Sequence, residues 1–340
     1  MATLAQERLA AGLGRPRASR GSASRALTAY MYILPALIVM GVMTYTPMAF
    51  NLWMSFTNFD LKNLRVNAAA PDFVGLKNYI DILTNGVVIP NFDFWHVLGF
   101  NLFWTFSNVI FHVAIGILIA VLLNVEGLWF RGLYRAIFVL PIVIPTLVVA
   151  TVWKNMFDPD YGAMNQGLAA IGQLFGLSPV LFHIRWIDQI EPPIPGIPLT
   201  LSYFALLIAN LWLGWPFMTI VATGALQSIS KDFYEAASID GAGPVQQFWR
   251  ITLPLLRPAM VPAAMYGMIM TFNLFNLIYF VSGGGPVKQT EILVTQAFRL
   301  VNEQRLYGVA AAFGVYVMLV LLALTILTNR VARATESYDV

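Results

Sequence analysis

Six long stretches without a charged residue alternate with polar segments along this 340-residue chain. Each stretch is close to the roughly 20 residues that a helix needs to cross a lipid bilayer. We expect helices rather than strands, because an open strand would leave its backbone groups unpaired in lipid. The predicted fold class is therefore all-α, a polytopic membrane protein with about six crossings: Ala29–Phe56, Trp95–Asn124, Ala136–Trp153, Leu199–Gln227, Ala259–Phe280 and Gly308–Thr328.

Composition supports this membrane assignment. Hydrophobic residues make up 58% of the chain and charged residues only 11%, whereas about a quarter of a typical soluble domain is charged. The chain has no cysteine, so disulfides, thiolate nucleophiles and cysteine metal sites are excluded. The net charge of +3 gives no sign of the clustered basic face that nucleic-acid binding requires.

The distribution of Lys and Arg predicts the orientation of the crossings. Residues 1–27 are rich in Ala, Gly, Ser and Arg, and we expect a disordered cytoplasmic tail. A cleaved signal peptide is the disfavoured alternative, since the following apolar run is too long and lacks a clear cleavage site. With the N-terminus inside, a transmembrane domain over 28–329 and a second cytoplasmic tail over 330–340, most Lys and Arg lie on inner segments, as expected. The outer segments hold only Lys62, Arg65, Lys77, Lys154, Arg185, Lys288, Arg299 and Arg305.

A polar insert, 228–258, separates the fourth and fifth crossings and is predicted to be cytoplasmic. Ser230 is a good N-cap for a helix, and Gly241 can end that helix in a left-handed conformation. Pro244 fits the first turn of a second short helix. We expect that helix to be stopped by Pro254 and Pro258, which gives a stiff helix–turn–helix rather than a flexible loop.

The spacing within the insert is more specific than this outline. Glu235-Ala236-Ala237 is followed by Gly241 four residues later, and then by Ile251-x-Leu253-Pro254. This pattern resembles the EAA loop of binding-protein-dependent ABC importer permeases, which forms coupling helices that dock into a cleft on a cytoplasmic ATPase subunit. An ordinary interhelical loop on the membrane surface is the alternative. The resemblance implies that the ATPase-coupling residues are Glu235, Ala236, Ala237, Asp240, Gly241, Ile251, Leu253 and Pro254.

The predicted crossings lack the ionisable residues that catalysis or energy coupling within the membrane would need. They contain no Asp, Glu, Lys or Arg, although secondary transporters and pumps generally need intramembrane ionisable groups. No phosphate-binding loop of the G-x-x-x-x-G-K-[ST] type is present, so ATP would be used by a partner subunit. His96, His112 and His183 are scattered and predict no metal site. We therefore predict a protein that is not an enzyme and has no cofactor or metal of its own.

Neutral polar residues within the crossings are the better candidates for function. Asn101, Thr105, Asn108 and His112 fall on one face of the second crossing, where interhelical hydrogen bonding ranks ahead of lining a pathway. Other candidates are in the fourth and fifth crossings. Asn donates and accepts at once, which suits a hydroxyl-rich solute. These further polar positions are Asn210, Thr271, Asn273 and Asn276.

A second resemblance places sugar contacts on these crossings. Asn210-x-Trp212-Leu213-Gly214, the Asp240–Pro244 segment and Gly284-Gly285-Pro286 are similar to the larger membrane subunit of maltose-type importers, most clearly from about Tyr203 to Thr328. The family has Ser and Asn at several fifth-crossing positions that are less polar here, so the resemblance implies the sugar class without specifying maltose. The implied substrate-pathway residues are Asn210, Leu213, Gly214, Gly267, Met270, Thr271 and Leu274, with Asn273 and Asn276 one helical step away.

The sequence thus predicts the permease subunit of an ABC importer for a neutral carbohydrate, maltose-like or related, in a bacterial inner membrane. Its expected partners are a second permease, an ATP-binding subunit dimer, an extracytoplasmic sugar-binding protein and the lipid bilayer, without nucleic acid. The alternative is a stand-alone channel or facilitator for a small neutral polyol. The Glu235–Pro254 pattern favours the importer, because a channel has no reason to display an ATPase-docking loop.

Overall fold

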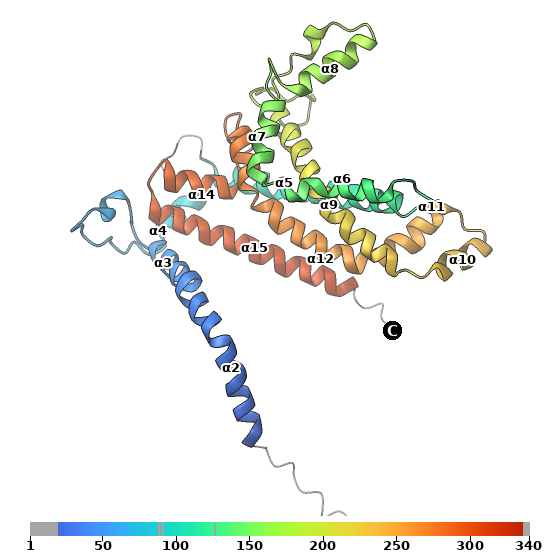
Figure 1. Cartoon of the computed structure of the whole chain (residues 1–340). Helices are drawn as coiled ribbons and strands as arrows, with labels where there is room; N and C mark the ends of the chain where they lie inside the picture. Colours follow the sequence, from blue (N-terminus) through green and yellow to red (C-terminus); the bar gives the residue numbers. More distant parts are fainter. Residues whose placement is uncertain (1–19, 88, 90–91, 126, 336–340) are drawn as a thin grey trace, which may run out of the picture. The chain divides into compact units, whose positions relative to one another are not determined.

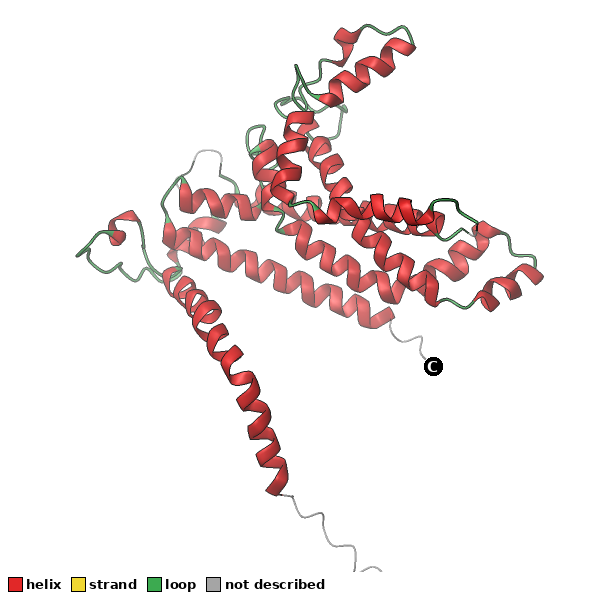
Figure 2. Ribbon diagram, viewed as in Figure 1, coloured by secondary structure: helices red, strands yellow, loops and turns green. Residues whose placement is uncertain are grey.

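A computed structural model describes residues 20–87, 89, 92–125 and 127–335, and within them the regular elements are helices apart from one isolated bridge between Thr57 and Phe73 (Figure 2). The all-α prediction is confirmed. The π-helical turns are η1, η4 and η5, and the 3₁₀ turns are η2 and η3. In chain order the elements are α2 Arg20–Met40, η1 Gly41–Tyr45, α3 Thr46–Met54, η2 Leu61–Leu64, α4 Lys77–Leu83, α5 Phe94–Leu123, α6 Arg131–Val143, α7 Thr146–Met156, α8 Ala163–Leu174, η3 Pro179–Phe182, α9 Leu201–Ser228, α10 Lys231–Ile239, α11 Pro244–Gln247, η4 Phe248–Thr252, α12 Leu253–Phe272, α13 Phe275–Leu277, η5 Ile278–Ser282, α14 Leu293–Asn302 and α15 Tyr307–Thr335.

The first crossing belongs to a structural unit of its own that ends at Met54. Helices α2 and α3 are joined by the π turn η1, where Thr46 Oγ1 donates to the Gly41 carbonyl at 3.0 Å. The span 30–54 is long and apolar enough to cross a membrane. Helix α2 begins at Arg20, inside the tail predicted for 1–27, while residues 1–19 lie outside the described part of the chain.

Three spanning helices, α5, α9 and α12, form the centre of the second unit, which begins at Ser55 (Figure 1). Their close approach depends on small residues. A Cβ added at Gly116 of α5 would come within 2.9 Å of the Met218 backbone on α9, so any larger residue would push the two helices apart. A buried cluster that includes Met218, Ala222 and Met260 fills the space among these helices.

The third crossing is not the continuous helix predicted for Ala136–Trp153. It is broken into α6 and α7, which meet at an angle of 97°. Ile144 has extended backbone angles, φ −79° and ψ 129°, because the ring of the following Pro145 disfavours helical geometry at the preceding residue. The described chain therefore contains five helices able to span a membrane, and a sixth if the bent pair counts as one crossing.

The fifth crossing also differs from its prediction. Pro254 and Pro258 do not stop a helix, since η4 leads directly into α12 and the span runs over Pro244–Phe272. Pro254 directly follows the π turn η4, and spanning helices tolerate interior prolines such as Pro254 and Pro258. The predicted end at Phe280 is wrong as well. Asn273 ends the helix, and its side chain donates to the Ile269 carbonyl at 3.0 Å, a local bond of the kind that competes with helix geometry.

The sixth crossing, α15, packs against α4, α12 and α14. Its described part runs to Thr335, five residues beyond the start of the predicted tail at 330, and residues 336–340 lie outside the described chain. An ion pair links α14 to the segment before it: Arg299 Nε in α14 donates to Oε1 of the buried Glu291 at 2.8 Å, and another nitrogen of Arg299 donates to the Gly283 carbonyl at 2.6 Å. Burial raises the pKa of the Glu291 carboxyl, and the nearby Arg299 opposes that shift. This pair fixes the glycine-rich turn that follows η5.

Candidate functional site

A pocket of about 510 Å³ opens among α5, α9, α12 and the break between α6 and α7. Its volume lies within the range of small-molecule sites in proteins. The helices that form it come from crossings far apart in the sequence, so their packing in the second unit assembles the pocket. The predicted pathway residues that line it are Asn210, Leu213, Gly214, Gly267, Met270, Thr271 and Leu274.

Two predicted pathway residues are placed elsewhere. Asn273 and Asn276 are not among the residues that line the pocket. The Asn273 amide bonds to the carbonyl of Ile269 in its own helix, and Asn276 lies in α13, beyond the end of α12. The structure therefore does not bring either side chain to the other pathway residues.

The pocket has a wall that the sequence reasoning missed. It comes from the broken third crossing, where Ile144 and Thr146 flank Pro145. Pro141 and Pro145, four residues apart in an uncharged run, were a usable signal. At membrane depth, non-helical backbone is tolerated only where it is buried in protein or lines a cavity. The lining residues not predicted for the pathway are His112, Pro141, Ile142, Ile144, Thr146, Phe217, Met218 and Tyr266.

The pocket lining contains polar groups but no Asp, Glu, Lys or Arg. Thr271 is a buried residue that lines the pocket, and its hydroxyl makes no hydrogen bond within the described chain. Neutral donors and acceptors beside apolar side chains can hold a hydroxyl-bearing solute, whereas an ion there would lose its hydration without a charged partner.

Asn210 takes part both in the pocket lining and in the contact between helices α5 and α9. Its Nδ2 donates to Oδ1 of Asn108 on α5 at 2.7 Å. The Oδ1 of Asn210 accepts no hydrogen bond from the described part of the chain, and the residue lines the pocket. The same side chain thus contributes interhelical bonding through one atom and leaves its acceptor for a solute.

The polar face of the second crossing mainly ties helices together. Asn101, Thr105, Asn108 and His112 are all buried. Asn101 Nδ2 donates to the Phe272 carbonyl at 3.2 Å, and its Oδ1 accepts from the Leu293 backbone at 3.0 Å. Interhelical bonding, ranked first for this face, is confirmed for Asn101 and Asn108. His112 is exceptional because it also lines the pocket.

The polar insert forms the predicted helix–turn structure at the end of α9. Ser230 Oγ caps α10 by accepting from the Asp232 backbone at 3.3 Å, and Gly241 has the predicted positive φ of 82°. Tyr234 and Thr252 are linked through their hydroxyls at 3.0 Å. Gln247 Nε2 donates to Ser238 Oγ at 2.9 Å. These bonds hold α10 against α11 and η4, which makes the insert stiff.

The insert presents both charge and apolar surface. Glu235, Ala236, Asp240 and Gly241 are exposed, whereas Ala237, Ile251, Leu253 and Pro254 are half-buried. The side chain of Ile239 is 87% exposed, which is unusual for an apolar residue on a short polar helix. Exposed apolar side chains on a rigid element are typical of a protein-docking surface.

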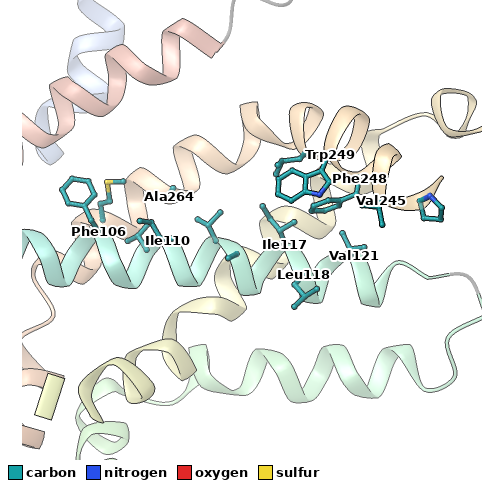
Figure 3. Close-up of a pocket in the computed structure, with 15 residues that line it drawn as sticks. Phe106, Ile110, Ile117, Leu118, Val121, Val245, Phe248, Trp249 and Ala264 are labelled. Atoms are coloured by element: carbon teal, nitrogen blue, oxygen red, sulfur yellow. The ribbon is translucent and has the colours of Figure 1, made fainter. Parts of the chain in front are cut away.

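An apolar groove of about 810 Å³ runs from the insert along α5 (Figure 3). Ile110 and Ile117 form one side of it, and Phe248 and Trp249 of η4 form the other. Apart from the indole N–H of Trp249, the side chains that line this groove are apolar and offer no group for recognising a polar solute. The 510 Å³ pocket is therefore the better candidate for a solute site.

Sequence comparison assigns the family. The family model described as binding-protein-dependent transport system inner membrane component matches residues 112–337. The chain belongs to this family. The matched region contains the pocket and the insert, so both are features of a binding-protein-dependent transport component, and the resemblance of the insert to an EAA loop agrees with this assignment.

Members of the binding-protein-dependent transport family with sugar transport in their names resemble the chain along most of its length. It is 33% identical over 294 residues to the galactooligosaccharides transport system permease protein of Bacillus subtilis, covering 84% of this chain and 66% of that protein. It is also 33% identical over 304 residues to the trehalose/maltose transport system permease protein of Thermococcus litoralis, covering 89% and 93%. These relatives are transport permeases.

A solved structure shows the same fold. A bacterial ABC transporter involved in the import of the acidic polysaccharide alginate matches with a TM-score of 0.72 and 23% identity, covering 92% of this chain and 98% of that chain. The helix arrangement described above is therefore the fold of an ABC transporter membrane chain.

Proposed function

We propose that this chain is a permease subunit of an ABC importer and forms half of the membrane pathway for a neutral oligosaccharide. The observation that carries the proposal is the 510 Å³ pocket, which unites Asn210, Leu213 and Gly214 of α9 with Gly267, Met270, Thr271 and Leu274 of α12. The sugar-transporting relatives support the same substrate class.

The lining favours neutral sugars by its chemistry. Amide and hydroxyl groups of Asn210 and Thr271 match sugar hydroxyls, and Tyr266 and Phe217 offer the aromatic faces on which a sugar ring packs. No carboxylate or ammonium group lines the pocket, so an ionic solute would lack a counter-charge from this chain.

The insert would connect this pathway to an energy source outside the chain. In this proposal a cytoplasmic ATPase dimer receives Glu235, Ala236, Asp240 and Gly241 from the exposed side of the insert. The half-buried Ala237, Ile251, Leu253 and Pro254 hold the insert on the spanning helices. A second permease completes the pathway, an extracytoplasmic binding protein delivers the sugar, and both termini lie in the cytoplasm.

The test is reconstitution of the chain with the permease, ATPase and binding-protein subunits encoded beside it. We expect the subunits to co-purify, and we expect maltose, trehalose, maltodextrin or galactooligosaccharide to stimulate ATP hydrolysis and to enter proteoliposomes only with ATP. Uptake of glycerol by the chain alone, without ATP, would instead support the facilitator. A complex in which none of the four sugars stimulates hydrolysis would refute the neutral-sugar assignment.

A further inference from the structure

His112 is the one imidazole in the pocket lining, and its polar edge faces helix α9. Its Nε2 lies 3.0 Å from the Asn210 carbonyl oxygen. A Cβ built on Gly214, one turn further along α9, would come within 2.5 Å of Nδ1. The ring therefore occupies the space that any side chain at position 214 would take.

The contact with Asn210 determines where the ring proton lies. A backbone carbonyl oxygen only accepts hydrogen bonds, so Nε2 must carry the hydrogen and donate it. In the neutral imidazole, Nδ1 then has a lone pair and acts as an acceptor. The main chain of α9 thus selects the tautomer, independently of any solute.

The Nδ1 acceptor remains available in this arrangement. No group in the described chain donates a hydrogen bond to it, and it is not among the fully enclosed polar atoms without a partner, unlike Nε1 of Trp104. His112 lines the pocket, and Gly214, against which the ring lies, lines the same pocket. Gly214 keeps Nδ1 accessible, since a larger residue at this position would collide with the imidazole ring.

We propose that His112 is a specificity-determining residue of the transport pathway, with Nδ1 accepting a hydrogen bond from a hydroxyl of the neutral carbohydrate. The inference rests on the proposed function and extends it to α5, a helix whose polar face the sequence assigned to packing ahead of pathway lining. Together with the Oδ1 of Asn210, it gives the pocket two acceptors on neighbouring helices that face a hydroxyl-rich solute.

Two substitutions separate this role from helix packing. His112→Gln can keep an amide N–H near Nε2, and with it the bond to the Asn210 carbonyl, but it places no acceptor at Nδ1. His112→Asn can place its Oδ1 near Nδ1 but loses the donor to Asn210. Asn108→Ala serves as a control, because it breaks a buried bond between the same helices without lining the pocket.

Uptake of maltose, trehalose, maltodextrin and galactooligosaccharide is measured in proteoliposomes, with recovered complex as the measure of assembly. We expect His112→Gln to raise the apparent KM for the transported sugar roughly two- to tenfold, the effect of one lost hydrogen bond, with assembly close to wild type. His112→Asn should lower recovery while changing the apparent KM less than His112→Gln does.

A packing role predicts the reverse order, with His112→Gln unaffected and His112→Asn defective in both measures. An unchanged apparent KM in His112→Gln overturns the inference even when His112→Asn fails to assemble. A shift of equal size in the Asn108→Ala control also overturns it. If the wild-type complex takes up none of the four sugars, the proposed function fails first, and the role of His112 fails with it.

Discussion

Replacing Asn210 by Ala tests whether this residue acts in the pathway or only between helices, because the structure provides a matched partner. The bond from Asn210 Nδ2 to Asn108 Oδ1 is lost equally in Asn210→Ala and in Asn108→Ala. An interhelical bond in a membrane is worth about 0.6 kcal/mol, so both variants should lose about that much stability from this bond. Asn108→Ala loses in addition the bond from its Nδ2 to the Trp104 carbonyl, so its thermal stability should be no higher than that of Asn210→Ala. Asn210 alone lines the pocket, and its Oδ1 is the acceptor offered to a solute.

Losing that second contact should cost Asn210→Ala about 1 kcal/mol of solute binding, which is roughly a fivefold rise in the apparent KM for sugar uptake. The assay is uptake into proteoliposomes at equal amounts of assembled complex, with the thermal midpoint recorded for each variant. The double variant should be no less stable than Asn108→Ala, since that single variant has already lost the bond between the two side chains. Equal uptake defects in Asn108→Ala and Asn210→Ala would refute the reasoning and leave Asn210 a packing residue.

Three further predictions concern the insert, the buried ion pair and the topology. Gly241→Val forces a β-branched residue to φ 82°, at a cost of about 1–2 kcal/mol, and should uncouple ATP hydrolysis from uptake while the membrane part stays folded. Gly243→Val at negative φ is the control, and wild-type coupling in both Gly241→Val and Glu235→Lys would contradict the docking role. Arg299→Met leaves the buried Glu291 without its counter-charge and should destabilise the chain by about 3–5 kcal/mol, measured by thermal unfolding. The exposed Arg305→Met should have little effect, and a similar loss in both would show that the ion pair is not the cause. Single cysteines at Ser22 and Ser337 should resist an impermeant thiol reagent in intact cells, while one at Ala69 should react, and the opposite labelling would reverse the orientation.

The crossings and the insert could be predicted because their signals are local. Lipid demands a long uncharged helix wherever the chain crosses, and Gly241 follows its helix at the position where a left-handed residue is needed. The breaks were harder to predict. The apolar composition of the third crossing is the same before and after Pro145. The helix is broken there only because Ile144, the residue before the proline, prefers extended backbone angles.

The candidate site likewise contains residues that the sequence could predict and residues that it could not. Asn210 and Thr271 could be predicted as pocket residues from their polarity and from the family resemblance. Asn273 and Asn276 could not be placed, because helical extrapolation beyond Phe272 assumes a helix that ends there. His112 was assigned to packing, since its second role depends on the absence of a side chain at Gly214 on another crossing. A contact of that kind has no signal in either helix alone.

In the proposed importer, helix α12 connects the insert to the pocket. It begins at Leu253 within the insert and carries Thr271 of the pocket lining, about 27 Å further along at 1.5 Å per residue. A rigid helix of this kind carries a displacement of the insert to the pocket, and a displacement of the pocket to the insert. The coupling free energy between two binding sites is the same in both directions. If binding of the ATPase to the insert changes the affinity of the pocket for sugar, then bound sugar must change the affinity of the insert for the ATPase by the same factor.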